Sequence, residues 1–517
     1  MKPNKSRTAL SAVNILSGFA NRLLTSLLKL LGRIVFFRLL SAELYGVSGL
    51  FSNVLGLLSF AELGIGTAIT FSLYRPIVDK DEEKIASLMR FYRIAYRSIA
   101  LVVLVAGLGL MPFLTRLIHD YQGIDYFYWI YLLFLFNMVI DYLFSYKRTL
   151  AVAYQEGFRL VPFTTGGEAL TCLLQIAVLF LFSHERICFL LYLAVQTVCL
   201  LLQNIAINRY LDKTYPVLTK TALATPLPKE ERRDLFVNVK ALIYHKIGTL
   251  VVAGTDNLLI SKLIGLVAVG LYSNYNAMIV AVSGIVYLFA GNTTASFGNL
   301  IASETPEKRR AVFEEAQFFY FSLYGIGCAF FLTAFQPFIS LAYGEAFCLE
   351  FPVVVLVVVS NFYLLGITYV LDVVKGAAGL YDKDKWLPLV QSAVNLAVSI
   401  VLGKRLGLVG IFWGTFVSTF IPLIGKPVIL YKYVFSSSPV PYFRTLLFEL
   451  FSTAVMCAAS LGACRLLPAL SPLFTLILNL AVTALVSFGV FFLLHARSPY
   501  LPALRGRVKG LIRRKGD

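Results

Sequence analysis

The sequence predicts an all-α integral membrane protein with about 14 transmembrane helices, and three observations lead to this fold class. Hydrophobic residues make up 58% of the 517 residues, and charged residues make up only 14%. The mean hydropathy of +0.77 lies far above the range of soluble globular proteins. The apolar residues also gather in stretches of about 20, which is the length that an α-helix needs to cross a bilayer.

These apolar stretches follow one another along the whole chain. Their centres lie near Asn21, Leu58, Val103, Phe136, Leu173, Val198, Leu250, Ile285, Tyr324, Ser360, Leu396, Thr419, Ala458 and Ala481. The longest polar interruption, residues 212–234, contains Pro216, Pro226, Pro228 and a cluster of charges. Because this composition is typical of linkers, we expect it to join two lobes of six helices.

The predicted organisation has five parts. They are an N-terminal lobe over 1–210, a cytoplasmic linker over 211–235, a C-terminal lobe over 236–435, two more helices over 436–496 and a basic tail over 497–517. Because six is even, both lobes enter the membrane in the same direction, so a pseudo-two-fold axis along the membrane normal should relate them.

A short internal repeat supports the two-lobe prediction. Gly-Leu-Phe-Ser-Asn at 49–53 recurs as Gly-Leu-Tyr-Ser-Asn at 270–274. Aligning Gly49 with Gly270 gives an offset of 221 residues, whereas aligning Gly46 with Gly270 gives 224. The sequence does not choose between these registers. At the second offset Arg22 is equivalent to Lys246.

The cations of this chain, whose net charge is +18, collect in alternate connections between the apolar stretches and in the C-terminal tail. The positive-inside rule then places both termini in the cytoplasm. Such a distribution favours contact with anionic lipid headgroups and argues against nucleic acid as a partner. The seven cysteines form no CxxC pair and lie mostly in apolar stretches, which argues against disulfides and thiolate metal sites.

The first apolar stretch contains three cations, Arg22, Lys29 and Arg33, at spacings of seven and four residues. These spacings place them on one helical face. Because a lysine or arginine near the bilayer centre costs about 2.5 to 3.5 kcal/mol, such a row should face a wet cavity and bind an anion. For Arg33, near the predicted helix end, snorkelling of the side chain to the interface is the favoured interpretation, and a place in the binding row is the other.

The seventh stretch has a similar chemistry, with Lys240, His245, Lys246 and Asp256. We interpret Lys246, which lies about ten residues into its helix, as the substrate-binding partner of Arg22. Lys240 and His245 are further candidates, although Lys240 could also snorkel. Asp256 is either the partner of a neighbouring lysine or a coupling or gating residue.

Glu62 precedes Leu63-Gly64-Ile65-Gly66 in the second stretch, where it is predicted to gate the pathway or to cap a helix break at the glycines. Other candidate cleft residues have no assigned role: Asp141, Glu168, Asp372 and Lys375. Tyr272 and Tyr275 are candidate platforms for sugar stacking.

The sequence lacks a P-loop, metal-ligand spacing and a nucleophile arrangement, so we predict neither an enzyme nor a cofactor. Energy would come from the membrane potential, a proton or sodium gradient, or consumption of the product outside. A membrane polysaccharide polymerase or glycosyltransferase is the enzymatic alternative. Such enzymes usually need catalytic residues on a sizeable extracytoplasmic loop, and the predicted loops on that side are short.

Two segments carry a resemblance to a known family: GTDNLLISKLIGLVAVGLYSNYNAMI and LLSAELYGVSGLFSNVLGLLSFAELGIGTAI. With the six-linker-six layout, they resemble bacterial oligosaccharide-lipid flippases of the Wzx type, within the multidrug/oligosaccharidyl-lipid/polysaccharide (MOP) exporter superfamily. The resemblance covers most of the chain. It implies two six-helix lobes that expose a cavity to alternate sides of the bacterial cytoplasmic membrane.

The cargo that this resemblance implies is an undecaprenyl-pyrophosphate-linked oligosaccharide, moved to the outer leaflet for capsule or exopolysaccharide synthesis. It also implies that Arg22 binds the pyrophosphate, that helices 13 and 14 line a groove for the lipid tail, and that a polysaccharide polymerase and other assembly proteins are partners. The related lipid II flippase has basic residues on its second and eighth helices. This chain has Glu62 on the second and no Lys or Arg in the body of the eighth, which argues against lipid II. A multidrug or metabolite exporter of the same superfamily is the alternative, although deep basic residues disfavour cationic drugs.

Overall fold

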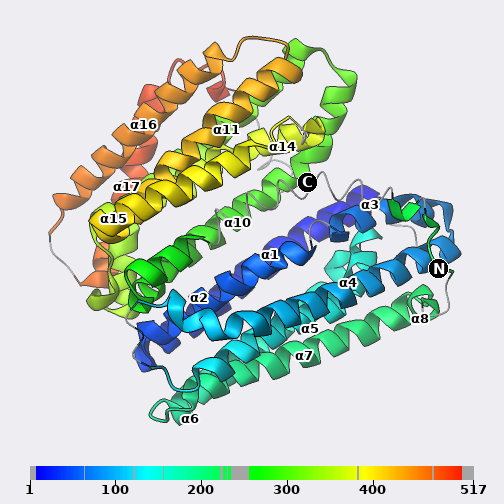
Figure 1. The fold of residues 1–517 in the computed structure, drawn as a ribbon. Helices are drawn as coiled ribbons and strands as arrows, with labels where there is room; N and C mark the ends of the chain where they lie inside the picture. The colour runs from blue at the N-terminus through cyan, green and yellow to red at the C-terminus, as the bar shows by residue number, and fades with distance from the viewer. Residues whose placement is uncertain are drawn as a thin grey trace. The chain divides into compact units, whose positions relative to one another are not determined.

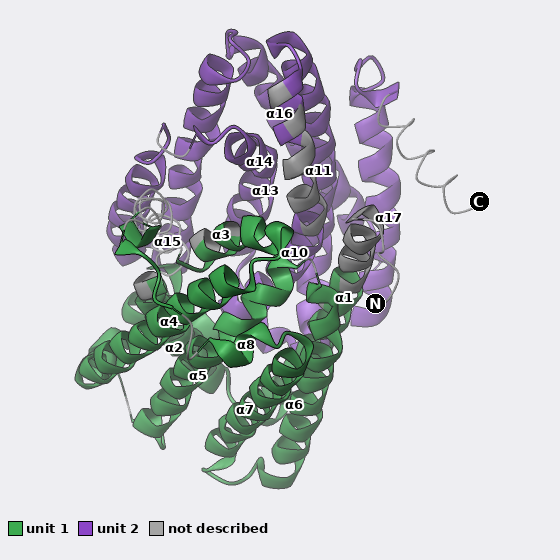
Figure 2. Ribbon diagram, turned by 90° about the vertical axis from the view of Figure 1, so that its right-hand side faces the viewer, with its two compact units in different colours: residues 1–270 green, residues 271–517 purple. Residues whose placement is uncertain are grey.

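The computed structural model describes residues 7–62, 65–119, 121, 123–154, 156–221, 225–229, 231–233, 255–380, 383–468 and 471–502. All regular structure in these ranges is helical, as the composition predicted. The chain divides into two compact units, unit 1 over residues 1–270 and unit 2 over residues 271–517 (Figure 2).

Unit 1 is a bundle of long apolar helices joined by short connections (Figure 1). The helices are α1 (Arg7–Leu39), α2 (Ala42–Leu58), α3 (Ile65–Asp79), α4 (Glu82–Leu110), α5 (Phe127–Ala153), α6 (Val161–Phe182), α7 (Cys188–Thr214) and α8 (Val217–Lys220). α1 packs on α6, α4 on α5, and α7 on both α5 and α6. Ser41 and Asp81 cap α2 and α4 by accepting hydrogen bonds from backbone N–H groups of the first turn.

The second apolar stretch is a broken helix. α2 ends at Leu58, the 3-10 turn η1 covers Ser59–Glu62, and α3 begins at Ile65. The described interruption therefore begins at Ser59, ahead of Glu62, and residues 63 and 64 of the predicted break lie outside the described residues. A helix that ends inside an apolar segment leaves backbone groups without helical partners, so such breaks occur where polar groups or cavities are close.

Two glycines allow close contact between α2 and the start of α10 (Leu266–Ser303). A Cβ on Gly46 would lie 2.0 Å from the carbonyl oxygen of Leu266, and one on Gly270 would lie 2.2 Å from that of Ala42. Adding 224 to the residue numbers 42 and 46 gives 266 and 270. The contact of 46 with 266 and the contact of 270 with 42 are therefore equivalent under this offset. This crossing therefore favours the offset of 224 for the internal repeat.

Polar contacts hold the linker against the beginning of α4. Lys220 pairs with Glu82 at 3.4 Å, and Lys84 pairs with Glu231. The hydroxyl of Thr225 lies 3.2 Å from that of Ser87. The described part of the linker therefore packs against the start of α4.

The chain passes into unit 2 within α10. The further helices are α11 (Pro306–Tyr343), α12 (Phe351–Val357), α13 (Leu365–Ile367), α14 (Tyr369–Ala377), α15 (Leu387–Tyr433), α16 (Val440–Arg465) and α17 (Pro472–Leu494). The π-helical turn η5 (Val358–Leu364) lies between α12 and α13 in one continuous membrane-length segment. α17 packs on α11 and α16, so the last two helices belong to the core of unit 2.

The long element α15 is a hairpin of two helices. Gly407 has φ 61° and ψ −136°, a conformation that glycine adopts readily. Ser399 Oγ donates to the carbonyl of Ile411 at 2.9 Å, and Asn395 Nδ2 donates to Thr415 Oγ1 at 3.1 Å. These bonds cross between the arms, which correspond to the stretches predicted near Leu396 and Thr419.

Thirteen of the fourteen predicted centres lie on helices, and Leu250 lies outside the described residues. Within the described ranges, ten helices are long and apolar enough to cross a membrane, counting α15 once. The chain is therefore an all-α, multi-pass membrane protein. The predicted total of about 14 spans remains an expectation.

Candidate functional site

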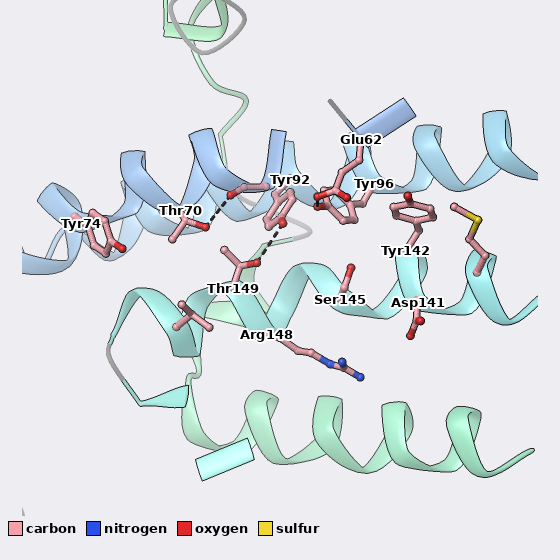
Figure 3. Close-up of a pocket in the computed structure, with 13 residues that line it drawn as sticks. Glu62, Thr70, Tyr74, Tyr92, Tyr96, Asp141, Tyr142, Ser145, Arg148 and Thr149 are labelled. Carbon is pink, nitrogen blue, oxygen red and sulfur yellow. Dashed lines mark hydrogen bonds between the residues drawn. The ribbon is translucent and has the colours of Figure 1, made fainter. Parts of the chain in front are cut away.

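A cavity of about 720 Å³ lies inside unit 1, lined from η1, α3, α4 and α5 (Figure 3). Its lining residues are Glu62, Gly66, Thr70, Tyr74, Tyr92, Tyr96, Met138, Asp141, Tyr142, Ser145, Arg148, Thr149 and Val152. Tyr142 precedes the end of α5 at Ala153 by eleven residues, or about 17 Å along the helix. The cavity therefore places polar groups deep within apolar helices, where such groups usually have a function.

Glu62, at the end of η1, is the carboxylate nearest the tyrosines of this cavity. The hydroxyl of Tyr96 donates to Glu62 Oε1 at 2.6 Å. The rings of Tyr92 and Tyr96 meet edge to face, with centroids 4.4 Å apart, and the Tyr92 hydroxyl lies 3.1 Å from that of Thr149. The 3-10 turn thus positions one carboxylate beside a pair of tyrosines on α4. One of these tyrosines also contacts a threonine of α5.

Gly66 lets the first turn of α3 approach this cluster. A Cβ at this position would lie 2.8 Å from the Tyr96 hydroxyl, 2.9 Å from the Tyr92 hydroxyl and 3.1 Å from Glu62 Oε1. The first two separations are shorter than a carbon atom tolerates. The glycine that the sequence placed next to the helix break therefore keeps three polar atoms together.

α5 contributes two chemically different faces. Tyr142, Ser145 and Thr149, at spacings of three and four residues, point toward α3 and α4 (Figure 3). Asp141 and Arg148 extend from α5 on the side away from Glu62. Arg148 Nη2 donates to Asn204 Oδ1 of α7 at 2.6 Å, so this guanidinium is directed toward the packing between α5 and α7.

The basic residues predicted on the first helix all lie on α1. The ammonium of Lys29 is 3.1 Å from the Glu168 carboxylate of α6, yet 70% of the Lys29 side chain remains exposed. The guanidinium of Arg33 lies 4.6 Å from the ring centroid of Tyr45, a cation–π contact. Arg22 is in the helix two turns before Lys29, and its side chain is outside the description.

Of the site residues predicted on the seventh stretch, the structure describes only Asp256. Lys240, His245 and Lys246 lie outside the described residues. Asp256 is buried in the helix over 255–263, where it interacts with other residues of the protein. The substrate-binding, coupling and gating roles predicted for these four residues therefore remain predictions.

The remaining polar candidates of the sequence lie in unit 2. Asp372 accepts from Lys426 at 2.7 Å and contacts Lys375 at 3.3 Å, and Lys375 also pairs with the buried Asp384 at 2.6 Å. These groups form a charge cluster between α14 and α15. Tyr272 and Tyr275 are buried, with hydroxyls bonded to Asn361 and Gln336, so they act as core residues and not as sugar platforms.

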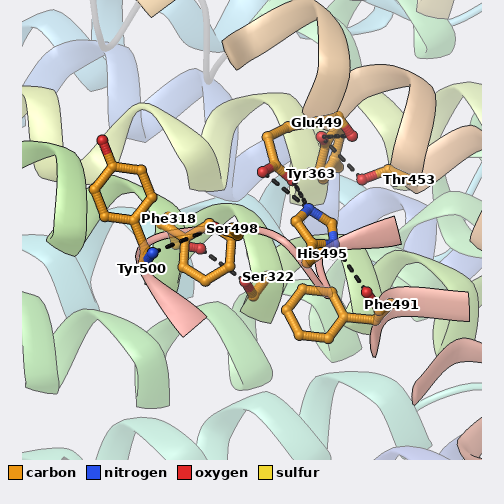
Figure 4. A network of polar contacts seen from close by, with 9 residues as sticks. All are labelled: Phe318, Ser322, Tyr363, Glu449, Thr453, Phe491, His495, Ser498 and Tyr500. Carbon is orange, nitrogen blue, oxygen red and sulfur yellow. Dashed lines mark hydrogen bonds and ion pairs between the residues drawn. The ribbon is translucent and has the colours of Figure 1, made fainter. Parts of the chain in front are cut away.

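A buried ion pair lies at the end of α17 (Figure 4). His495 Nε2 is 3.1 Å from Glu449 Oε1, and the two residues are 2% and 3% exposed. Burial alone would lower the pKa of His495, but the hydrogen bond and charge of Glu449 outweigh it and raise this pKa above its ordinary 6.5. Tyr500 follows His495 in the chain, and its hydroxyl donates to Glu314 at 3.0 Å. Burial, together with the charge and hydrogen bond of Glu314, raises the pKa of Tyr500 to about 12.

Sequence reasoning missed most of the cavity lining. Tyr92 and Tyr96 are four residues apart, and Tyr142, Ser145 and Thr149 follow a 3-4 spacing, so each set marks one face of a helix. That periodicity of hydroxyl groups in apolar helices was the available signal. Tyrosine is also abundant at membrane interfaces, which conceals such a set among ordinary residues.

The solved structures to which this chain is similar are membrane transporters. A lipid II flippase, MurJ, in an inward closed conformation matches with a TM-score of 0.62 and 13% identity, over 93% of this chain and 98% of the flippase. An inward-facing multidrug resistance MATE transporter of the MOP superfamily matches with a TM-score of 0.59 and 14% identity, over 79% of this chain and 95% of the transporter. The MATE transporter VcmN of Vibrio cholerae matches with a TM-score of 0.55 and 13% identity, over 83% of this chain and 99% of that protein.

Neither a family model nor a curated protein sequence matches this chain. At 13 to 14% identity, the structural similarity establishes the fold and leaves the substrate open. The chain is a multi-pass integral membrane protein with the fold of MOP-superfamily transporters.

Proposed function

We propose that this chain is a flippase for a polyprenyl-pyrophosphate-linked oligosaccharide in a bacterial cytoplasmic membrane. The observation that carries the proposal is the row of cations Arg22, Lys29 and Arg33 along α1 of a chain with this transporter fold. Glu168 contacts Lys29 but leaves most of the side chain exposed. A largely exposed ammonium in a membrane-length helix is suited to an anionic ligand.

The physical problem fits such a cargo. A glycan and a pyrophosphate cannot enter hydrocarbon without losing their hydrogen bonds to water, whereas the polyprenyl chain remains in the lipid throughout. The transporter would therefore enclose only the headgroup. Its fold suits alternating access, in which a binding site opens to one side of the membrane and then to the other.

Arg22 and Lys246 would bind the pyrophosphate with charge-assisted hydrogen bonds, supported by Lys29, Arg33, Lys240 and His245. Both termini would lie in the cytoplasm. Asp256 and Glu62 would couple transport to an ion or gate the pathway. The potential is an additional driving force, because an empty cationic site returns inward with about 2.3 kcal/mol per charge per 100 mV.

The test is to deplete the protein in its own cell and to quantify lipid-linked oligosaccharides on each leaflet with a membrane-impermeant label. Complete repeat units trapped inside would support the flippase, and units accumulating unpolymerised outside would indicate a polymerase. Arg22→Ala or Lys246→Ala should abolish transport with normal expression and insertion. Normal transport in both variants would refute the pyrophosphate clamp.

A second candidate is an exporter of organic cations. The observation that favours it is Glu62, a carboxylate surrounded by Tyr92, Tyr96 and Tyr142, since aromatic rings and a carboxylate together attract cations. Efflux of ethidium that depends on this protein, with lipid-linked oligosaccharides unchanged on both leaflets, would favour the exporter over the flippase.

A further inference from the structure

We infer that the cavity among η1, α3, α4 and α5 of unit 1 binds an uncharged sugar ring of the cargo. This inference rests on the proposed function and adds a subsite separate from the cations of α1. The polar groups that would contact the sugar are Glu62, Tyr142 and Ser145, with the rings of Tyr92 and Tyr96 beside them.

The lining has the chemistry that a sugar ring requires. A pyranose presents hydroxyl groups around its edge, each both donor and acceptor, and C–H groups on its faces. Carboxylate and hydroxyl oxygens suit the edge, and aromatic rings suit the faces. In this cavity two carboxylates, four tyrosines and the hydroxyls of Thr70, Ser145 and Thr149 line a single space.

Several of these groups retain hydrogen-bonding capacity. The Tyr96 hydroxyl uses Glu62 Oε1, but each of the two carboxylate oxygens can accept up to two hydrogen bonds. The hydroxyls of Tyr142 and Ser145 have no hydrogen-bond partner among the described residues and border the cavity. Thr70 donates to the carbonyl of Gly66 at 2.7 Å, which leaves its oxygen able to accept. A ligand rich in hydroxyls can satisfy all of these groups.

The size of the cavity agrees with a small polar ligand. Its volume of about 720 Å³ falls within the roughly 300 to 1,000 Å³ of ordinary ligand pockets. Apart from Met138 and Val152, its lining side chains are aromatic, hydroxylated or charged, and Gly66 adds backbone alone. A lipid tail would leave these polar groups without partners and is therefore disfavoured.

Charge separates this subsite from the pyrophosphate. Arg148 is the cation among the lining residues, and its side chain points away from Glu62 (Figure 3). Its guanidinium donates to Asn204 of α7. The cluster around Glu62 thus presents a negative group and hydroxyls. An anion would be repelled there, whereas the exposed Lys29 on α1 would attract it. Unit 1 therefore offers one site for phosphate and a different one for sugar.

The test compares two lipids on the full-length protein in nanodiscs: undecaprenyl pyrophosphate, and the lipid-linked oligosaccharide isolated from cells depleted of this protein. Wild-type protein should bind the oligosaccharide-bearing lipid more tightly. Glu62→Gln and Tyr142→Phe should each weaken that binding about three- to tenfold and leave undecaprenyl pyrophosphate within about twofold. Tyr128→Phe is the matched control for Tyr142→Phe, because Tyr128 is an exposed tyrosine on α5, the helix that also contains Tyr142.

The outcomes separate the two proposals. Absence of wild-type binding to both lipids would overturn the proposed function and the subsite with it. If wild-type protein binds both lipids, and the variants lose affinity for both lipids equally or for neither, the subsite alone is overturned. If the variants instead lose only tetraphenylphosphonium binding, the cavity is a site for organic cations. Ser145→Ala, a smaller change, repeats the comparison if a variant fails to retain the wild-type melting temperature.

Discussion

Glu62 and Glu449 both lie in apolar helical segments, but their surroundings are opposite. Glu62 accepts a hydrogen bond from Tyr96 and borders an open cavity. Glu449 is 3% exposed, and both of its oxygens lie within 3.2 Å of His495 Nε2. The rings of Phe318, Phe448 and Phe491 surround that histidine. Glu449 is therefore enclosed by aromatic rings and its histidine partner, whereas Glu62 has space beside it that a ligand would fit.

Replacing each of the two carboxylates by alanine should give the largest difference in the free energy of unfolding. Glu449→Ala leaves His495 buried without its partner and should cost about 3 to 5 kcal/mol of stability. Glu62→Ala, which opens onto the cavity, should cost less than about 1.5 kcal/mol. Chemical unfolding of the purified proteins measures both, with Glu185→Ala, at an exposed loop position, as control. Equal losses at Glu62 and Glu449 would contradict the distinction.

Gly66→Ala should damage the cavity without unfolding the protein. The new Cβ must displace Tyr92, Tyr96 or Glu62, so transport should fall roughly tenfold or more. Gly56→Ala is the control, because no atom lies within 4 Å of its added Cβ. Transport is measured as labelled lipid-linked oligosaccharide reaching the outer leaflet. Wild-type transport by Gly66→Ala would show that this part of the cavity is not used.

The stability of unit 2 should depend on pH through His495. Because the folded pKa lies above the ordinary 6.5, the protonated pair stabilises fully below pH 6.5, and this contribution is lost as pH rises through the raised pKa. Melting temperature should therefore fall across that window in the wild type. The slope should be smaller in His495→Gln, and an identical slope in both proteins would assign the effect to other groups.

The ion pair between Lys29 and Glu168 should give the smallest effect on stability. Since the lysine side chain is 70% exposed, Glu168→Gln should change the unfolding free energy by no more than about 1 kcal/mol. Its effect on ligand binding should run in the opposite direction, because Lys29 loses a competing carboxylate. Tighter binding of undecaprenyl pyrophosphate by Glu168→Gln would support an anion site on α1, and weaker binding would argue against it.

The amino-acid sequence alone predicts the fold class and the location of most helices. Apolar stretches of membrane length identify helices because the bilayer tolerates no unpaired backbone, so thirteen predicted centres lie on helical segments. The break predicted at the glycines after Glu62 falls partly on residues 63 and 64, which the structure does not describe, and the described interruption begins earlier, where α2 gives way to a 3-10 turn at Ser59. The row of cations on α1 was equally visible, since helical spacing alone places its members on one face.

Which polar residues meet depends on how the helices pack against one another. Tyr92 and Tyr96 of α4, Tyr142 of α5 and Glu62 of η1 are far apart in the sequence, and helix packing brings them around one cavity. Packing likewise assigned Tyr272 and Tyr275 to the core and joined Glu449 to His495. Periodicity specifies the face of one helix, whereas a site depends on which faces of different helices are turned toward each other.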